Sequence, residues 1–318
     1  MADNVLTITL NPTVDKSCTV PQIVAEKKLR CSAPVYEPGG GGINVARGLT
    51  RLAIPADALF TSGGRTGVLL ESLLEREKVG IIPVPVSGET RENFIAADES
   101  NNQQFRFGMP GEEMSAAETQ AIIQKLASLD PFPRWVVISG SLPPGMGHAD
   151  FISVIEAVKT KNARLVVDTS GSALKAAVEE GVYLLKPNMG ELSSLVGVEE
   201  LDNASAEQAA KQLIDQGKAE AVAISMGAQG ACLVTRDQSY YANAPAVKKR
   251  STVGAGDSMV AGMLAKMAAG SGWQEVIHMG VACGTAATMN PGTALFNQKD
   301  AEKLYQWVSN AKAVRDTY

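Results

Sequence analysis

A glycine-rich loop near the C-terminus carries the residue types best suited to chemistry in this chain. The segment Ser251-Thr-Val-Gly-Ala-Gly-Asp-Ser258 precedes a run of helical periodicity over residues 259–269. Glycines directly before a helix let free backbone amides point outward, and the positive end of the helix dipole favours an anion there. Asp257 lies inside this predicted anion site, where a carboxylate is unusual and would serve either as a helix cap or in chemistry. The loop is neither a Walker A motif nor a dinucleotide fingerprint.

A second polar segment, Lys186-Pro-Asn-Met-Gly-Glu191, follows a short apolar run. Asn188 and Glu191 are three residues apart, so they share one face on the first turn of a helix. Their oxygens suit Mg²⁺, which proteins often hold partly through water and nucleotide phosphates. The same spacing is typical of a capping box, and the two roles are compatible.

Composition narrows the classes of function. The chain has 318 residues, of which 45% are hydrophobic and 20% charged, and this predicts a globular protein with a substantial core. A net charge of -5 disfavours general binding to nucleic acid backbones. We expect a cytoplasmic protein without membrane contact, because apolar runs are short and a strand pattern begins at once. Four scattered cysteines predict reduced thiols, and two histidines are too few for a histidine-rich metal site.

Alternating elements are expected to position these loops. From residue 135 onward, short apolar runs alternate with stretches of helical periodicity. The runs are 135–139, 165–168, 183–185 and 221–225, and the helical stretches include 150–161 and 204–217. This alternation predicts βαβ units on a mostly parallel sheet, where binding sites gather at the carboxyl ends of the strands.

Two stretches interrupt this rhythm. Residues 13–36 and 87–110 lack long helical periodicity, and residues 93–97 and 103–107 alternate as antiparallel strands do. We therefore expect a small β-sheet lid, made by 13–36 and 87–110, over an α/β core. The predicted core comprises residues 1–12, 37–86 and 111–318.

Four motifs resemble, in order, those of the phosphofructokinase B branch of the ribokinase-like kinases. They are Gly39-Gly-Gly-Gly-Ile-Asn-Val-Ala-Arg47, Ser139-Gly-Ser-Leu-Pro-Pro-Gly145, Lys186-Pro-Asn-Met-Gly-Glu191 and Ser251-Thr-Val-Gly-Ala-Gly-Asp-Ser258. Each is weakly specific alone, but the ordered set spans nearly the whole chain. The resemblance implies a three-layer α/β fold with a mostly parallel sheet flanked by helices. It also implies ATP and Mg²⁺ as cofactors, K⁺ as a further candidate, and a homodimer whose lids pack together.

The resemblance also assigns roles to individual residues. Asp257 would be the general base, and the amides of Gly254, Ala255 and Gly256 would stabilise the transferring phosphoryl group. The residues expected to bind substrate are Asp15, Lys28, Arg30, Gly40, Gly41, Asn44, Arg91, Arg106 and Ser141. Those expected to bind the nucleotide are Lys186, Asn188, Ser225, Gly227, Gly230, Gly284 and Asn290. The expected Mg²⁺ ligands are Asn188 and Glu191, and the expected monovalent-cation ligands are Ser251, Val253, Ala287, Asn290 and Gly292.

The residues by themselves leave structural alternatives open. Gly40 and Gly41 would equally serve close packing of a helix on a strand. The glycines of Ser225-Met-Gly-Ala-Gln-Gly230 would equally form a hairpin turn. Arginines scattered over a lid are often solvated surface charges.

The resemblance favours a substrate that is already phosphorylated. Arg91 and Arg106 match phosphate-contacting positions, and the arginine fork fits phosphate oxygens. The stretch around the first motif resembles the minor bacterial 6-phosphofructokinases, and Gly39-Gly-Gly-Gly42 stands where 1-phosphofructokinases and tagatose-6-phosphate kinases usually have GGKG. We therefore expect phosphorylation of the C1 hydroxyl of fructose 6-phosphate. The alternatives are those two activities or a catalytically silent sugar-phosphate-binding regulator. A dehydrogenase is disfavoured because Asn11-Pro-Thr-Val-Asp15 replaces the required fingerprint.

Overall fold

The protein is described by a computed structural model that covers residues 4–101 and 103–311. Its main sheet has nine strands: β1 Val5–Thr9, β4 Ala56–Ser62, β5 Gly80–Pro85, β8 Trp135–Ser139, β9 Arg164–Asp168, β10 Val182–Leu185, β11 Ala219–Ser225, β12 Ala231–Thr235 and β13 Ser239–Ala242. Their order across the sheet is β13-β12-β11-β10-β9-β8-β1-β4-β5. Neighbours from β5 to β11 pair in parallel, whereas β12 runs antiparallel to both β11 and β13. The predicted mostly parallel sheet is confirmed.

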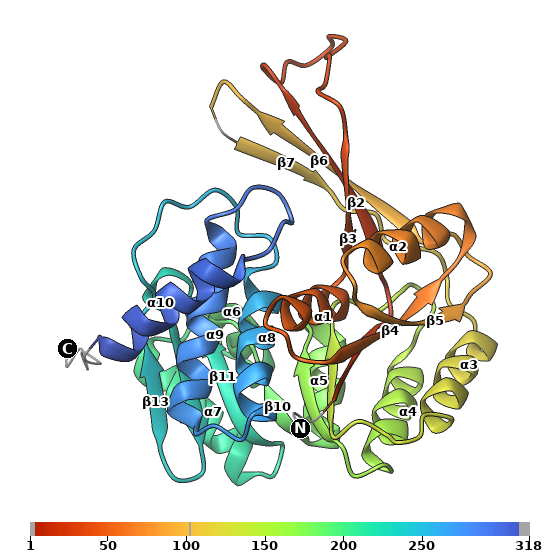
Figure 1. The fold of residues 1–318 in the computed structure, drawn as a ribbon. Coiled ribbons are helices and arrows are strands. Elements are labelled where there is room, and N and C mark those ends of the chain that lie inside the picture. The colour runs from red at the N-terminus through yellow and green to blue at the C-terminus, as the bar shows by residue number, and fades with distance from the viewer. Residues whose placement is uncertain (1–3, 102, 312–318) are drawn as a thin grey trace.

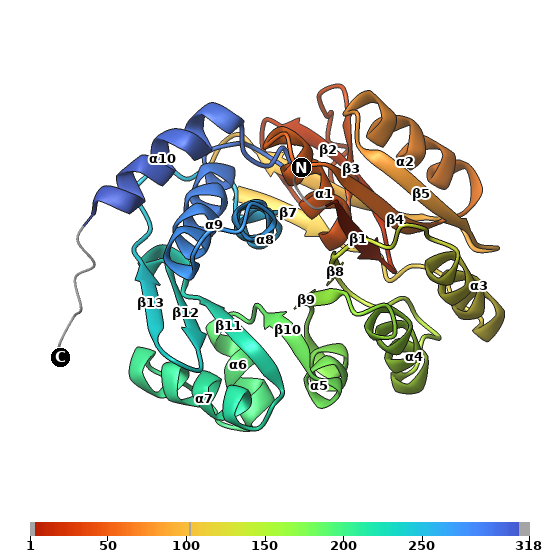
Figure 2. The ribbon, with the colours of Figure 1, turned by 60° about the horizontal axis from the view of Figure 1, so that its bottom comes forward.

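Helices cover both faces of this sheet, which gives three layers (Figure 2). One face is covered by α1 Gly41–Arg51, α2 Gly64–Arg76, α8 Ala255–Ala268 and α9 Trp273–Thr288, with α10 Gln298–Asn310 packed on α9. The other face is covered by α3 Ala116–Ala127, α4 His148–Lys159, α5 Gly171–Glu180, α6 Met189–Val196 and α7 Asn203–Asp215.

The central strands explain why both faces need cover. Leu6 and Ile8 of β1 pack into the core beneath α3 to α7, whereas Val5 packs into the core beneath α1, α8 and α9. Successive side chains of a strand point to opposite faces, so a strand covered on both sides needs apolar residues at nearly every position. This pattern produced the apolar runs from which the strands were predicted.

A second, four-stranded sheet projects from the body, at the top of Figure 1. Its strands, in order across the sheet, are β3 Val35–Gly39, β2 Thr13–Val20, β6 Arg91–Asp98 and β7 Gln103–Phe107. The sheet is rooted at the carboxyl end of β1, because β2 follows β1 closely and β3 leads into α1. The predicted boundary at residue 36 falls inside β3, because residues 37–39 pair with residues 13–15 of β2.

One helix differs from its prediction in a way that matters for the site. α8 begins at Ala255, ahead of the predicted start at residue 259. The first turn carries glycine, aspartate and serine, so apolar periodicity does not report it. Asp257 therefore belongs to the helix itself. Across residues 4–101 and 103–311, no helix combines the length and the apolar character needed to cross a bilayer.

Candidate active site

The first turn of α8 presents backbone amides beside a carboxylate. Gly254 precedes the helix in a left-handed conformation with φ +71°, and a β-carbon there would lie 2.4 Å from Leu295 Cδ2. Glycine is therefore required at this position on two counts. Ser258 donates its backbone N–H to the Gly254 carbonyl at 2.8 Å and so begins the helical ladder. The amides of Gly256 and Asp257 precede that ladder, at the end of a helix where anions bind in other proteins.

Side chains from three other elements surround the Asp257 carboxylate. Asn44, on α1, donates its Nδ2 to Asp257 Oδ2 at 2.9 Å. Asp168 ends β9 and Lys186 follows β10, and these two form a buried ion pair at 3.1 Å. A β-carbon on Gly256 would lie 3.6 Å from Lys186 Nζ and 3.9 Å from Asp168 Oδ2. The glycine loop therefore faces the ion pair without obstruction. This agrees with the prediction that the polar loops lie together at the carboxyl ends of the strands.

This environment moves the pKa of Asp257 to about 7. Burial is the largest cause and the negative charge of Asp168 the next, whereas the Asn44 hydrogen bond and the Lys186 charge lower the pKa. The pKa of Lys186 is itself raised: burial is the largest single cause and lowers it, but the nearby carboxylates, Asp168 first among them, together raise it further. Asp257 is thus a carboxylate that can accept a proton at neutral pH, beside an ammonium group that stays charged.

The glycines at the start of α1 allow its close approach to the sheet. A β-carbon on Gly41 would lie 2.3 Å from Ser139 Oγ, and one on Gly42 would lie 2.6 Å from the Ile8 carbonyl. Gly40 has φ +113°, a conformation that favours glycine. The packing alternative is confirmed for these glycines, and this packing carries Asn44 to Asp257. Whether Gly40 and Gly41 also contact a ligand stays a prediction.

Asp15 lies at the root of the second sheet, on β2, and is 6% exposed. Asn93 on β6 donates its Nδ2 to Asp15 Oδ1 at 2.9 Å. A β-carbon at Gly39, on β3, would lie 2.7 Å from Asp15 Oδ2, so only glycine leaves room for the carboxylate. Burial raises the pKa of Asp15, against the Asn93 hydrogen bond and the charge of Arg91. The second sheet therefore holds a buried acceptor group close to the main sheet.

Asn188 and Glu191 form the predicted capping box at the start of α6. Asn188 Oδ1 accepts from the Glu191 N–H at 2.8 Å, and Glu191 Oε2 accepts from the Asn188 N–H at 2.9 Å. Their oxygens are of the hard type that Mg²⁺ prefers. In the part of the chain that the structure describes, no three Asp, Glu, His or Cys side chains form a metal cage. These residues fit Mg²⁺ only as partial ligands, with the remaining ligands from water and nucleotide.

Comparison with known proteins shows the family to which this chain belongs. Residues 5–300 match the family described as pfkB family carbohydrate kinase. The chain is 42% identical to the ATP-dependent 6-phosphofructokinase isozyme 2 of Escherichia coli K12, over 96% of this chain and 99% of that protein. It is 35% identical to the 1-phosphofructokinase of Bacillus subtilis, over 93% of this chain and 96% of that protein. The crystal structure of the Escherichia coli phosphofructokinase-2 in complex with potassium has a TM-score of 0.93, with 41% identity over 96% of this chain and 99% of that one.

This chain belongs to the pfkB family of carbohydrate kinases. The family resemblance inferred from the four motifs is confirmed, and so is the ribokinase-like fold. The α8 start, the Asp168–Lys186 pair and Asn44 lie together in this pfkB family chain, and their role in binding and catalysis stays a prediction.

In this pfkB kinase the predicted nucleotide loop is a tight connection between two antiparallel strands. The segment from Ser225 to Gly230 joins β11 to β12, and Gly227 has a positive φ. Gly230 has φ +107°, and a β-carbon there would lie 2.0 Å from the Ala242 carbonyl. The hairpin alternative is therefore confirmed, while nucleotide contact stays a prediction. Gly284, on α9, lies against the start of α8, where its β-carbon would be 3.1 Å from the Ala255 carbonyl.

The five predicted monovalent-cation ligands lie in two adjoining segments around the end of α9. Ser251 Oγ donates to the Gly292 carbonyl at 2.9 Å and accepts from the Val253 N–H at 3.2 Å. Asn290 donates its N–H to the Ala287 carbonyl at 3.1 Å. Each carbonyl oxygen has two lone pairs, so these bonds leave acceptor capacity for a cation. The structure brings the set together, and the cation role stays a prediction.

Arg91 lies at the root of the second sheet and is tied to the backbone. Its Nη1 donates to the Met109 carbonyl at 2.7 Å and its Nη2 to the Asn11 carbonyl at 3.0 Å. Asn11 Nδ2 in turn lies 3.4 Å from Ser141 Oγ. These contacts place Arg91 and Ser141 on neighbouring segments. Each terminal nitrogen of Arg91 keeps a second N–H for a ligand, so the predicted phosphate contact is compatible with its position.

The other three basic candidates lie away from Asp257 within one chain. Arg106 is exposed on β7 and donates to Gln104 Oε1 at 3.1 Å. Lys28 and Arg30 lie in the exposed loop between β2 and β3, at the outer end of the second sheet (Figure 1). A single copy of the chain does not bring these side chains together with the first turn of α8.

Two charged residues beside Asp257 or its partner Asn44 were not among the predicted candidates. Asp168 ends a predicted strand and begins a polar loop, which is a signal for a site residue in a parallel sheet. Arg47 closes the first motif, yet no pattern showed that it would be 1% exposed and bonded to Glu77. Its partners come from segments remote in sequence, so only the tertiary structure reveals them.

Proposed function

We propose that this chain transfers the γ-phosphoryl group of ATP to the C1 hydroxyl of fructose 6-phosphate, giving ADP and fructose 1,6-bisphosphate. The observation that carries the proposal is Asp257, a carboxylate with a pKa of about 7 in the first turn of a helix. A general base works best when its pKa lies near the operating pH. Support for the phosphosugar comes from the 42% identical relative named as a 6-phosphofructokinase.

The reaction needs a base, an electrophile and groups that stabilise the negative charge of the phosphates. Asp257 would take the proton of the C1 hydroxyl while that oxygen forms a bond to the γ-phosphorus and the bond to ADP breaks. The amides of Gly254, Ala255 and Gly256 at the helix start would stabilise charge on the transferring group. Lys186 is charged and buried, and it supplies a cation for the nucleotide phosphates. Mg²⁺, held in part by Asn188 and Glu191, would offset phosphate charge.

The sugar phosphate would lie between the two sheets. Asp15 offers a buried acceptor for sugar hydroxyls, and Asn44 is held beside the base. Arg91 at the root of the second sheet would contact the phosphate. In such an arrangement the C1 hydroxyl would lie at Asp257 and the phosphate at the opposite end of the sugar.

Lys28 and Arg30 would reach a site only in a second copy of the chain. The second sheet exposes several large apolar side chains, among them Val35 at 55% and Phe107 at 51% exposure. Exposed apolar surface of this kind favours association. We therefore propose a homodimer in which second sheets pack together and each copy lends basic residues to the other.

A second candidate is 1-phosphofructokinase activity. The 35% identity to the Bacillus subtilis 1-phosphofructokinase favours it, because that similarity also covers most of the chain. The two substrates differ in which end of fructose carries phosphate, so the arginine contacts decide between them.

The test is an ADP-release assay with Mg-ATP against fructose 6-phosphate, tagatose 6-phosphate, fructose 1-phosphate and fructose. We expect kcat/KM for fructose 6-phosphate to exceed each of the others by at least about tenfold, the effect of one or two well-placed hydrogen bonds. A preference for fructose 1-phosphate would instead support the second candidate. Folded protein that binds ATP but turns over no sugar would overturn both and favour a regulator.

A further inference from the structure

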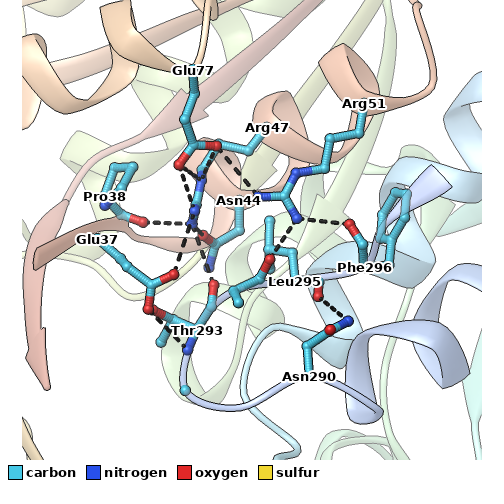
Figure 3. Close-up of polar contacts among 12 residues, drawn as sticks. Glu37, Pro38, Asn44, Arg47, Arg51, Glu77, Asn290, Thr293, Leu295 and Phe296 are labelled. Carbon is cyan, nitrogen blue, oxygen red and sulfur yellow. Dashed lines mark hydrogen bonds and ion pairs between the residues drawn. The ribbon is translucent and has the colours of Figure 1, made fainter. Parts of the chain in front are cut away.

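Arg47 lies at the centre of a polar cluster (Figure 3), and one member of that cluster, Asn44, contacts Asp257. It projects from α1 and is 1% exposed. Its Nε and Nη2 donate to the Glu77 carboxylate at 2.9 and 2.7 Å, and its Nη1 donates to the Pro38 carbonyl at 2.8 Å. Nη1 also donates to Asn44 Oδ1 at 3.1 Å. A buried guanidinium is thus paired with a carboxylate and uses its remaining donors on neighbouring oxygens.

The contact with Asn44 determines which way the Asn44 amide faces. An arginine side chain only donates hydrogen bonds, so the Asn44 atom that faces Arg47 must be the carbonyl oxygen. The NH₂ group of Asn44 then faces Asp257, to which it donates at 2.9 Å. With the amide reversed, NH₂ would meet the guanidinium and oxygen would meet the carboxylate, and both contacts would be repulsive.

Arg47 also joins the elements that enclose the site. Glu77 follows α2, and Pro38 lies on β3 at the root of the second sheet. The neighbouring Glu37 accepts from the Thr293 hydroxyl at 2.8 Å, in the segment that follows α9. The backbone of Thr293 lies 3.5 Å from Arg47 Nη1. The cluster therefore holds α1 in a fixed position relative to three other parts of the chain.

We propose that Arg47 is a positioning residue for the catalytic base: it holds the Asn44 amide so that Asn44 donates to Asp257. The proposal rests on the proposed role of Asp257. The other charged groups that face Asp257 are Asp168 from β9 and Lys186 after β10. Neither is a hydrogen-bond partner of Arg47, so their effects on Asp257 remain when Arg47 is replaced.

The test is the pH profile of kcat for Arg47→Met, compared with the unchanged enzyme. Without Arg47 the Asn44 amide is free to turn, and the hydrogen bond that favours ionised Asp257 is lost. The acid limb of the profile, where kcat falls as the pH is lowered, then moves to higher pH. We expect a shift of about one pH unit, so that kcat falls about tenfold at pH 6 and changes little at pH 9. The KM for ATP should stay within about twofold, because the hydrogen bonds of Arg47 do not reach the predicted nucleotide residues.

Arg51→Met is the matched control. Arg51 also lies on α1, pairs with Glu77 at 3.5 Å and donates to the carbonyls of Ala294 and Phe296, but it does not contact Asn44. We expect its acid limb to coincide with that of the unchanged enzyme. An equal shift in both variants would show a general loss of packing and would overturn the proposal.

Arg47→Lys decides the question if Arg47→Met does not fold. A lysine keeps the buried positive charge near Glu77 but has no fork to hold Asn44 as well. We expect the acid limb to shift in the same direction, and to show no added shift when Arg47→Lys is combined with Asn44→Ala. An unmoved limb, or the same added shift in the Asn44→Ala background, would overturn the role of Arg47. Normal turnover by Asp257→Asn would instead remove the base assignment itself.

Discussion

The two ends of strands β8, β9 and β10 lie in very different surroundings. We call the side of the main sheet at which these strands end the carboxyl edge, and the side at which they begin the amino edge. At the carboxyl edge, Asp168 ends β9 and Lys186 follows β10, and both lie beside Asp257. The three charges are held in a largely buried setting, where the carboxylate of Asp257 is disfavoured and its pKa rises to about 7. The carboxyl edge therefore disfavours the ionised form of Asp257.

At the amino edge of the same strands, a charge is stabilised by aromatic rings. Arg164 begins β9, and its guanidinium lies 5.1 Å from the Trp135 ring of β8 and 4.8 Å from the Tyr183 ring of β10. Tyr183 also stacks on Trp273 of α9, with ring centroids 6.0 Å apart. Cations over aromatic faces are attracted by the ring quadrupole, so this edge adds stability.

The difference shows that the presence of a groove does not by itself identify the active site in this fold. An open groove of about 880 Å³ lies at the amino edge, lined by residues that include Arg164 and Tyr183. The perturbed carboxylate, the buried lysine and the helix amides lie at the other edge. Functional residues in parallel sheets lie at the carboxyl ends because helices begin there, with free amides directed at the ligand.

Removing the base should have the largest effect. We expect Asp257→Asn to lower kcat by about 10²–10⁴-fold, the usual contribution of a positioned base. The folded pKa of Asp257 is raised, so its stabilising contribution is lost as pH rises through about 7. The asparagine variant should therefore be at least as stable as the parent at pH 8. Turnover and thermal unfolding measured together would separate the two effects, and near-normal kcat would contradict the assignment.

Removing Lys186, the buried cation of the carboxyl edge, should have the second largest effect. Lys186→Met leaves Asp168 buried without its partner and takes positive charge away from Asp257. We expect kcat/KM for ATP to fall about 10²-fold, comparable with the loss of one preorganised donor. Steady-state kinetics with varied ATP check this, and a loss of stability without a change in kcat/KM would limit Lys186 to a structural role.

The raised pKa predicts the pH dependence of the reaction. Asp257 accepts a proton only when ionised, so kcat should rise about tenfold per pH unit below about 7 and level off above it. Turnover between pH 5.5 and 9 with saturating substrates would show this limb. A profile that is flat down to pH 5 would mean that the base keeps an ordinary pKa.

The smallest effect is expected at the amino edge. Arg164→Met removes two ring contacts of roughly 0.5–1 kcal/mol each, which corresponds to a fall in Tm of about 1.5–3 °C in a protein of this size. The kcat should stay within about twofold, because the guanidinium lies at the far edge of the strands. A large loss of kcat in a folded Arg164→Met variant would contradict the conclusion that the amino edge contributes stability and not catalysis.

Much of the fold could be predicted from local patterns. Apolar runs between helical stretches predicted the parallel sheet, because strands covered on both faces need continuous apolar side chains. Asp257 and the capping box of Asn188 and Glu191 could also be predicted, because helix starts have short-range signatures. The early start of α8 was missed, since Ala255 is the one apolar residue among the first four of the helix and a single residue gives no periodicity.

The sequence by itself therefore determined the layers of this protein and the loop that carries its base. Only the tertiary structure decided what surrounds that base. Asn44 and Asp257 are 213 residues apart, and the Asp168–Lys186 pair depends on β9 and β10 being neighbours. The Arg47 cluster likewise needs α1, α2 and β3 to meet. Local propensity fixes which segments are strands and helices, but the order of strands follows from packing of the whole chain, and that order sets the charges beside Asp257.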